Sequence, residues 1–127
     1  MKILDLILRH KWYDMYLSGE KPEEYRDITP YWFRRLIDFD PELYHNGNPI
    51  PLYFEHDSFD TAFCISWDLN ASGVLSFKPY THVRFHRGYT NTTMMFPINE
   101  ITIDVGNLAW GAPTNRNVFI IKLRKRL

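Results

Sequence analysis

The feature that most constrains this chain is its succession of short strand-like segments, interrupted by only two clear helical signals. Ile3–Leu8 is an apolar run that predicts a first strand buried on both faces. His82–Arg87 alternates, so Val83 and Phe85 are expected on one face and the polar side chains on the other. Residues 118–123 form a β-branched run typical of a closing strand. The pattern predicts an α+β fold, a small mixed β-barrel with two or more short helices.

The two helical signals follow the first strand. Residues 10–18 place Trp12 and Tyr16 four positions apart, a spacing that stacks them on one side of a helix. Gly19 suits the left-handed position that ends such a helix. Further on, Thr29 followed by Pro30 is typical of a helix start, and this second helix should stop before Pro41. Trp12, Tyr16 and Trp67 are expected in the core.

Between these helices lies a dense group of charges. Residues 19–27 read GEKPEEYRD, with six charged side chains in nine positions. In an extended strand over 23–28, Glu24 and Arg26 fall on the same face, a few residues after Lys21. Two interpretations are open. The group is either a solvated turn with an exposed ion pair, or a polar cluster at the mouth of a cleft.

The middle and the end of the chain are less regular. Residues 38–60 are predicted to be mostly loop. Thr61–Trp67 and residues 73–77 are predicted strands, joined by a hairpin around 70–73, with Cys64 as a buried thiol. Residues 94–96 and 100–105 form two strands or one strand bent at Pro97. Residues 107–117 should form a turn-rich loop that contains Trp110.

Composition sets limits on function. The 127 residues suit one domain, 1–127, and the 15 basic and 15 acidic side chains cancel, so overall charge favours neither nucleic acid nor a membrane. The only cysteine excludes an intrachain disulfide and favours a reducing, cytoplasmic location. The apolar N-terminal run is too short to span a bilayer. The five histidines lack metal-ligand spacing, so we expect no metal and no cofactor.

Several of these motifs together resemble the ASCH domains, a branch of the PUA-like superfold. The resemblance rests on the aromatic helix, on Ser18-Gly-Glu-Lys-Pro-Glu-Glu-Tyr-Arg-Asp27, on Thr29-Pro-Tyr-Trp32, on Val83-Arg-Phe-His-Arg-Gly-Tyr89, and on Trp110-Gly111 before the closing strand. The match is spread over the chain and is weakest from residue 38 to residue 80. It implies a compact barrel with a cleft lined by the Gly-x-Lys turn.

The resemblance also implies a function. ASCH domains are associated with RNA or nucleotide ligands, so a polar cleft that binds RNA or a nucleotide-like small molecule is the leading expectation. Some small members hydrolyse acetylated cytidine with a Lys and a Thr three residues later. Lys21 matches that Lys, but Glu24 stands at the Thr position and could act only as a general base on water. A hydrolase in which Lys21 and Glu24 are catalytic is therefore the alternative. A protein-interaction domain without a nucleic-acid role is the third hypothesis.

The candidate site residues have distinct expected roles. Lys21 and Arg26 would contact anionic or carbonyl groups, and Glu24 would read a donor edge or orient Arg26. Basic residues interleaved with an aromatic suit phosphate contact plus base stacking. The expected ligand-binding set is Lys21, Glu24, Arg26, Trp32, Arg84, His86, Arg87, Tyr89 and Trp110. The basic C-terminal tail, residues 122–127, could add electrostatic contact to phosphates, although such a tail often serves only solubility.

Overall fold

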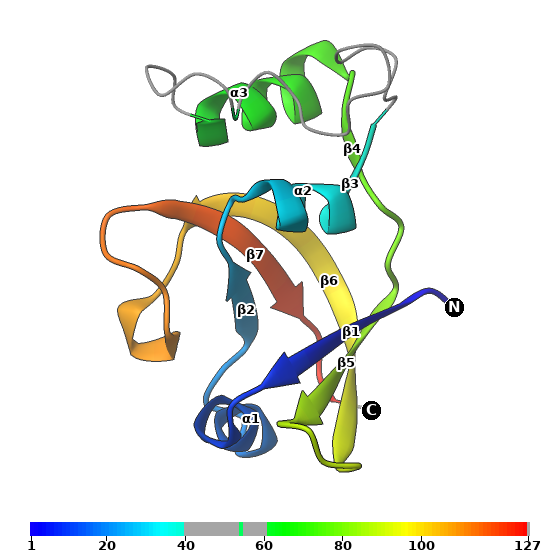
Figure 1. The fold of residues 1–127 in the computed structure, drawn as a ribbon, viewed down its shortest axis with the longest axis vertical. Helices are drawn as coiled ribbons and strands as arrows, with labels where there is room; N and C mark the ends of the chain where they lie inside the picture. Colours follow the sequence, from blue (N-terminus) through cyan, green and yellow to red (C-terminus); the bar gives the residue numbers. More distant parts are fainter. Residues whose placement is uncertain (40–53, 55–60, 127) are drawn as a thin grey trace. The chain divides into compact units, whose positions relative to one another are not determined.

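A computed structural model describes residues 1–39, 54 and 61–126 of the chain (Figure 1). Its contacts divide into two compact units. The first unit joins Met1–Tyr25 with Pro79–Leu127, and the second is Arg26–Lys78. The units are described in turn, and the expected single domain over 1–127 stays a prediction.

The first unit is built on a curled five-stranded sheet with the order β1-β5-β6-β7-β2 (Figure 1). Its strands are β1 Ile3–Leu8, β2 Glu23–Arg26, β5 His82–Arg87, β6 Thr93–Val105 and β7 Asn117–Leu123. β1 runs parallel to β5, whereas β5–β6 and β6–β7 are antiparallel pairs. The predicted mixed α+β class with a curled, barrel-like sheet is confirmed at this level.

β6 connects the two halves of the sheet. Its first part pairs with β5, with Pro97 opposite His82, and its later part pairs with β7, with Ile101 opposite Ile121. The register shifts between Ile98 and Glu100, next to the proline. A proline cannot donate a backbone hydrogen bond, so a change of pairing partner is well placed there. Of the two predicted arrangements, the structure has the single strand that is irregular near Pro97.

The alternation of β5 is confirmed, because Val83 and Phe85 are fully buried. The expectation that β1 is buried on both faces is wrong. Leu4, Leu6 and Leu8 are buried, but Ile7 is 51% exposed. The reason is that the other face of β1 carries Asp5, whose partners Arg84 and His86 stand on the same face of neighbouring β5. This face is therefore a polar surface.

The helix α1, His10–Leu17, ends as predicted. Gly19 has a φ of +83°, and its N–H donates to the carbonyl of Tyr16 while the N–H of Glu20 donates to that of Met15. This is the Schellman arrangement, which satisfies carbonyls at a helix end. The chain then turns directly into β2. Tyr16 stacks on Phe85 of β5 with ring centroids 4.4 Å apart, which fixes α1 to the sheet.

The second unit begins with helix α2, Pro30–Leu36. Thr29 caps it, because its Oγ1 accepts a hydrogen bond from the N–H of Trp32, and the helix ends before Pro41 as predicted. The two-residue strands β3, Ile37–Asp38, and β4, Ser76–Phe77, pair in antiparallel fashion. Most of the predicted loop over 38–60 lies outside the described residues.

The strand predicted over Thr61–Trp67 is wrong, because this segment forms helix α3. The π-helical turn η3, Asp68–Ser72, replaces the predicted hairpin around 70–73. Ala62 and Ile65, three residues apart, are the buried positions, and such a short apolar run does not distinguish helix from strand. Two burial predictions fail with it: Cys64 is partly exposed and Trp67 is 59% exposed. No helix in the described part of the chain is long and apolar enough to span a membrane.

Candidate functional site

The centre of the candidate site is a buried ion pair between α1 and β2. Lys21 and Glu24 are only 4% and 3% exposed. The Lys21 Nζ lies 3.0 Å from the Glu24 Oε1, and the same oxygen accepts a hydrogen bond from the backbone N–H of Tyr25. The structure therefore brings together two of the predicted site residues, and it places them inside the unit instead of on a solvated turn.

Three aromatic rings surround the Lys21 ammonium. The Nζ lies 4.7 Å from the ring centroid of Trp12, 4.9 Å from that of Tyr16 and 5.7 Å from that of Tyr25. Cation–π attraction and the Glu24 carboxylate both offset the cost of removing an ammonium from water. We call Trp12, Tyr16, Tyr25 and Glu24 the lysine cage.

Hydrogen bonds and close packing hold the cage rings in place. The Tyr25 hydroxyl donates to the Glu23 Oε1 at 2.6 Å and accepts from the backbone N–H of Asn107. Burial and the neighbouring Glu23 raise the pKa of Tyr25, so its phenol stays protonated. The Tyr16 hydroxyl donates to the carbonyl of Glu23 at 2.8 Å. Both tyrosines are therefore fixed through the same residue of β2.

The loop after β6 closes on the cage from another side. A Cβ added to Gly106 would lie 2.7 Å from the Tyr25 Cε1, and one added to Gly111 would lie 3.1 Å from the Trp12 Cζ2. Glycine is required at Gly106 because the tyrosine ring occupies the space of a side chain. Trp110 packs against the core cluster that contains Tyr25, so it supports the cage.

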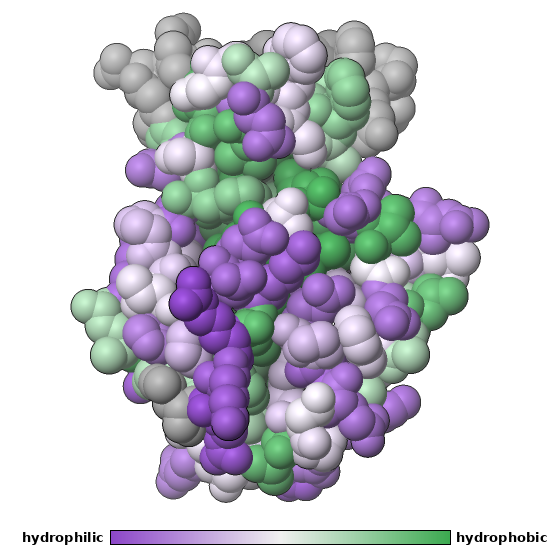
Figure 2. All heavy atoms as spheres, turned by 180° about the vertical axis from the view of Figure 1, so that it is seen from behind, coloured by the Kyte–Doolittle hydropathy of each residue, from purple (hydrophilic) through white to green (hydrophobic). Residues whose placement is uncertain are grey.

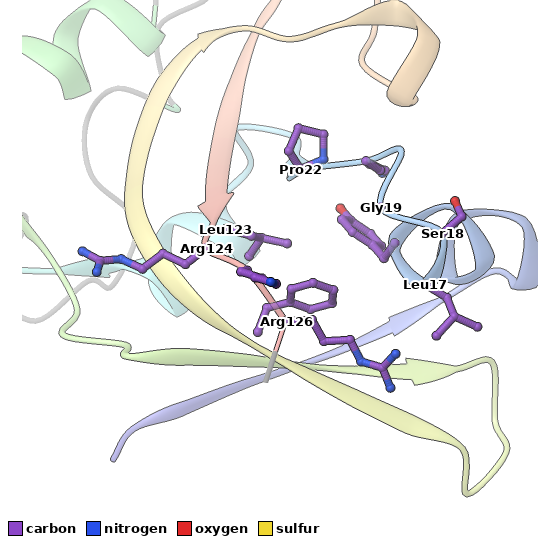
Figure 3. A pocket seen from close by; sticks show the side chains of 11 residues that line it. Leu17, Ser18, Gly19, Pro22, Leu123, Arg124 and Arg126 are labelled. Carbon is purple, nitrogen blue, oxygen red and sulfur yellow. The ribbon is translucent and has the colours of Figure 1, made fainter.

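A pocket of about 390 Å³ opens beside the Gly-x-Lys turn (Figure 3). The end of α1 and the turn form one wall, and Phe96 of β6 and the end of β7 form another. The lining residues are Tyr16, Leu17, Ser18, Gly19, Lys21, Pro22, Phe96, Leu123, Arg124, Lys125 and Arg126. Lys21 thus reaches from the cage to the pocket, while Glu24 is not among the lining residues.

The charge of the pocket lining is strongly one-sided. It contains Lys21 and the basic tail segment Arg124–Lys125–Arg126, and it contains no Asp or Glu. The three tail residues are exposed, and within the described ranges none of them has an ion-pair partner. Figure 2 shows strongly hydrophilic side chains forming a ridge on one face, with apolar atoms exposed beside it. In a chain of zero net charge, this pocket is a local concentration of positive charge.

The basic side chains predicted on β5 lie outside the pocket lining, and carboxylates pair with them. Arg84 donates to both oxygens of Asp5 at 2.7 and 3.2 Å, and the His86 Nε2 lies 2.8 Å from the Asp5 Oδ1. Arg87 binds Asp14 in the same two-pronged way at 3.2 and 3.3 Å. These hydrogen bonds lower the pKa of both aspartates. None of these basic residues lines the pocket.

The other predicted site residues also lie outside the pocket lining. Arg26 and Trp32 contact each other in the second unit, with the guanidinium 5.0 Å from the ring centroid. The Arg35 guanidinium lies 5.1 Å from the same ring, so Trp32 is flanked by cations. Tyr89 is 95% exposed in the turn after β5. A fully exposed ring in a turn offers a contact surface without any surrounding pocket.

Sequence reasoning missed most of the pocket wall. Tyr16 was expected only as a core residue, and Phe96 and Leu17 were assigned no role in the site. The signal for the tail is the basic run at residues 122–127, which predicts an electrostatic contact or a solubilising end. Where that tail folds back depends on two long-range hydrogen bonds, from Leu123 N–H to Pro22 and from Arg124 N–H to Pro97.

Across residues 1–39, 54 and 61–126, no group of three or more His, Cys, Asp or Glu is arranged to hold a metal ion. Comparisons of the chain with protein-family models, with curated proteins and with solved structures find no match.

Proposed function

We propose that this chain is an ASCH-type, PUA-like domain that binds RNA or a nucleotide-like small molecule in the pocket beside the Gly-x-Lys turn. The observation that carries the proposal is the pocket lining, which holds four basic residues and no acidic one. Lys and Arg side chains bind phosphate through charge-assisted hydrogen bonds, and a lining without carboxylates does not compete for them. The expectation of a cytoplasmic location rests on the single cysteine and stays a prediction.

The size and the apolar part of the pocket support the same ligand class. Its volume of about 390 Å³ falls within the range of small-molecule sites, roughly 300–1,000 Å³. Leu17, Phe96 and Leu123 supply apolar surface next to the basic tail. A nucleotide combines an apolar ring face with an anionic phosphate, so both kinds of lining find a counterpart in it.

Lys21 has a different role from the expected direct contact with an anionic or carbonyl group. Because its ammonium is almost fully buried and bound to Glu24, it contributes mainly by fixing the turn and by adding positive charge to the inner wall. The exposed tail residues are better placed for direct contact with a ligand.

The hydrolase alternative needs Glu24 to activate water beside a bound substrate. In the structure, the Glu24 Oε1 accepts hydrogen bonds from Lys21 and from the Tyr25 backbone. The residue also lies outside the pocket lining. This geometry favours binding over hydrolysis.

The proposal is tested by titrating the protein with a single-stranded RNA hexamer and with nucleoside monophosphates at about 50 mM salt. Leu17→Trp keeps every charge and places a bulky indole at the rim of the pocket, where Leu17 is 51% exposed, whereas Leu17→Ala keeps the pocket open. We expect wild type and Leu17→Ala to bind and Leu17→Trp to bind at least about tenfold more weakly, equivalent to about 1.4 kcal/mol. The affinity should also fall as salt rises, because phosphate contacts release counterions.

Three outcomes distinguish binding in the pocket from the alternative hypotheses. Equal binding by Leu17→Trp would show that the ligand binds outside the pocket. Negligible affinity for RNA and nucleotides at low salt would overturn the proposal and leave the protein-interaction reading. Release of acetate from acetylcytidine by wild type, lost in both Lys21→Ala and Glu24→Gln while both variants remain folded, would support the hydrolase.

A further inference from the structure

We propose that the ligand group bound at the outer edge of the pocket is a terminal phosphate monoester, and that Arg126 is its main contact. This inference rests on the proposed function and specifies which part of a nucleotide or RNA the pocket recognises. The same chemistry is present in a free nucleoside monophosphate and at a phosphorylated RNA end.

The direction of the side chains at the end of β7 supports this assignment. The backbone is anchored there, because Leu123 N–H donates to the carbonyl of Pro22 and Arg124 N–H to that of Pro97. In Figure 3 the Arg124 side chain extends away from the Gly19 turn, whereas the Arg126 side chain extends toward the side where Leu17 lies. Arg126 is therefore the labelled arginine whose guanidinium lies on the helix side of the pocket.

Unmatched positive charge at the edge of the pocket favours a phosphate monoester. Arg124, Lys125 and Arg126 are exposed cations without an ion-pair partner in the described part of the chain, while Lys21 is already matched by Glu24. A phosphate monoester carries a charge of about −1.5 to −2 at pH 7, and an internal phosphodiester carries only about −1. Coulomb attraction scales with this charge, so the cluster favours the monoester. Arg adds a two-pronged geometry that fits phosphate oxygens.

The shape of the apolar wall limits what a base can contact in the pocket. A volume of about 390 Å³ is near the lower end for small-molecule sites and has room for one nucleotide unit. The face of the Tyr16 ring is already stacked on Phe85, and both Tyr16 and Phe96 are buried. Little surface of either ring is therefore accessible for a base to stack on. Recognition of the phosphate should exceed discrimination between bases.

The experiment compares one RNA hexamer with a 5′-phosphate, with a 3′-phosphate and with hydroxyls at both ends, by calorimetry at about 50 mM salt. Adenosine and uridine monophosphates, each beside its nucleoside, form the small-molecule arm. We expect at least one terminally phosphorylated form to bind about tenfold more tightly than its unphosphorylated counterpart, the gain typical of one charge-assisted contact.

The variants isolate the contact. Arg126→Ala should remove most of the tenfold preference, Arg126→Lys should retain part of it, and Arg124→Ala should reduce it less than Arg126→Ala does. Arg9→Ala is the matched control, because Arg9 is exposed, makes no side-chain cap hydrogen bond and lies outside the pocket lining. Circular dichroism of each variant checks that the fold is retained.

Each result decides a different point. If all forms of the hexamer bind equally, and nucleotides bind no better than nucleosides, the terminal-phosphate inference is overturned while the proposed function stands. If no RNA and no nucleotide binds wild type, both fail together. If Arg124→Ala loses as much as Arg126→Ala, the assignment of the phosphate to Arg126 is wrong. Preference in the small-molecule arm alone supports the inference with a free nucleotide as the source.

Discussion

Lys21 and Glu24 form an ion pair of 3.0 Å in which both side chains are almost completely withdrawn from water. The partners are only three residues apart in the sequence: Lys21 follows the turn that ends α1 at Gly19, and Glu24 lies in β2. A buried pair of this kind is costly to break, because removal of one partner leaves the other as an uncompensated charge.

Removal of the carboxylate should therefore destabilise the fold strongly. We expect Glu24→Gln to lower the free energy of unfolding by about 3–5 kcal/mol, measured by urea denaturation. Glu100→Gln is the matched control, because Glu100 binds Lys122 at 3.3 Å in a largely exposed pair and should cost less than about 1 kcal/mol. Equal losses in the two variants would mean that Lys21 gains little from Glu24.

The cage should accept a replacement cation when its own is removed. Lys21→Ala leaves Trp12, Tyr16, Tyr25 and Glu24 around an empty space that matches an alkylammonium ion. We expect ethylammonium or butylammonium to raise the unfolding temperature of Lys21→Ala, with a gain of about 1.4 kcal/mol when the concentration is roughly tenfold above the dissociation constant. Sodium chloride at the same ionic strength should not reproduce the effect, and wild type should not respond. A variant that responds to both salts alike would contradict the cage.

The tight contact between Gly106 and Tyr25 should make this glycine intolerant of any side chain. Gly106→Ala places a Cβ 2.6 Å from the Ala112 Cβ and 2.7 Å from the Tyr25 Cε1. We expect a loss of about 1–3 kcal/mol in the free energy of unfolding, typical of overpacking. The near-ultraviolet circular dichroism of the tyrosines should change as well.

Gly19→Ala separates this steric effect from backbone strain. Gly19 has a φ of +83° with nothing within 4 Å of an added Cβ, so its substitution should cost only about 1–2 kcal/mol and leave the aromatic signal unchanged. An unchanged aromatic signal in Gly106→Ala would show that the added Cβ is accommodated without displacing the Tyr25 ring.

The polar face of β1 and β5 should contribute a pH-dependent stability. The Arg84 hydrogen bond, helped by His86, lowers the pKa of Asp5 below its usual value of about 3.8. A carboxylate with a lowered pKa in the folded state stabilises the protein above its unfolded pKa, and this contribution is lost as pH falls through the folded pKa. We expect Asp5→Asn to be less stable than wild type at pH 7 and to approach it near pH 2–3.

The size of that difference should be small, because Asp5 and Arg84 are both partly exposed and solvent screens their interaction. Urea denaturation of both proteins at pH 7 and near pH 2–3 measures it, at constant salt. A stability gap that is independent of pH would show that ionisation of Asp5 is not involved.

Local signals predicted several features of the fold well. The end of α1 at Gly19, the cap at Thr29 and the alternation of β5 all depend on neighbouring residues, so they are readable from the sequence. The sequence also indicates the charged cluster after Gly19, either as a solvated turn or as a polar cluster at the mouth of a cleft. What decided between them is the set of rings from Trp12, Tyr16 and Tyr25, which only the folded chain brings around Lys21.

The failures have physical causes that a single sequence conceals. The sequence of α3 predicts a strand wrongly, because seven residues with few polar positions show no clear hydrophobic periodicity. Arg84 and Arg87 were expected to hold phosphate, but their carboxylate partners Asp5 and Asp14 are more than seventy positions away in the sequence. The pocket wall at Arg126 depends on the return of the chain end to α1, a contact between opposite ends of the sequence.

That return has a practical consequence for anyone who handles this protein. Residues 124–126 border the pocket, so polypeptide joined after Arg126 emerges next to the space that a ligand would occupy. An acidic purification tag placed there would compete with the ligand for the same arginines. A tag fused ahead of Met1 leaves residues 124–126 uncovered, and a pair of otherwise identical preparations tagged at opposite ends would reveal how much binding depends on open access to these residues.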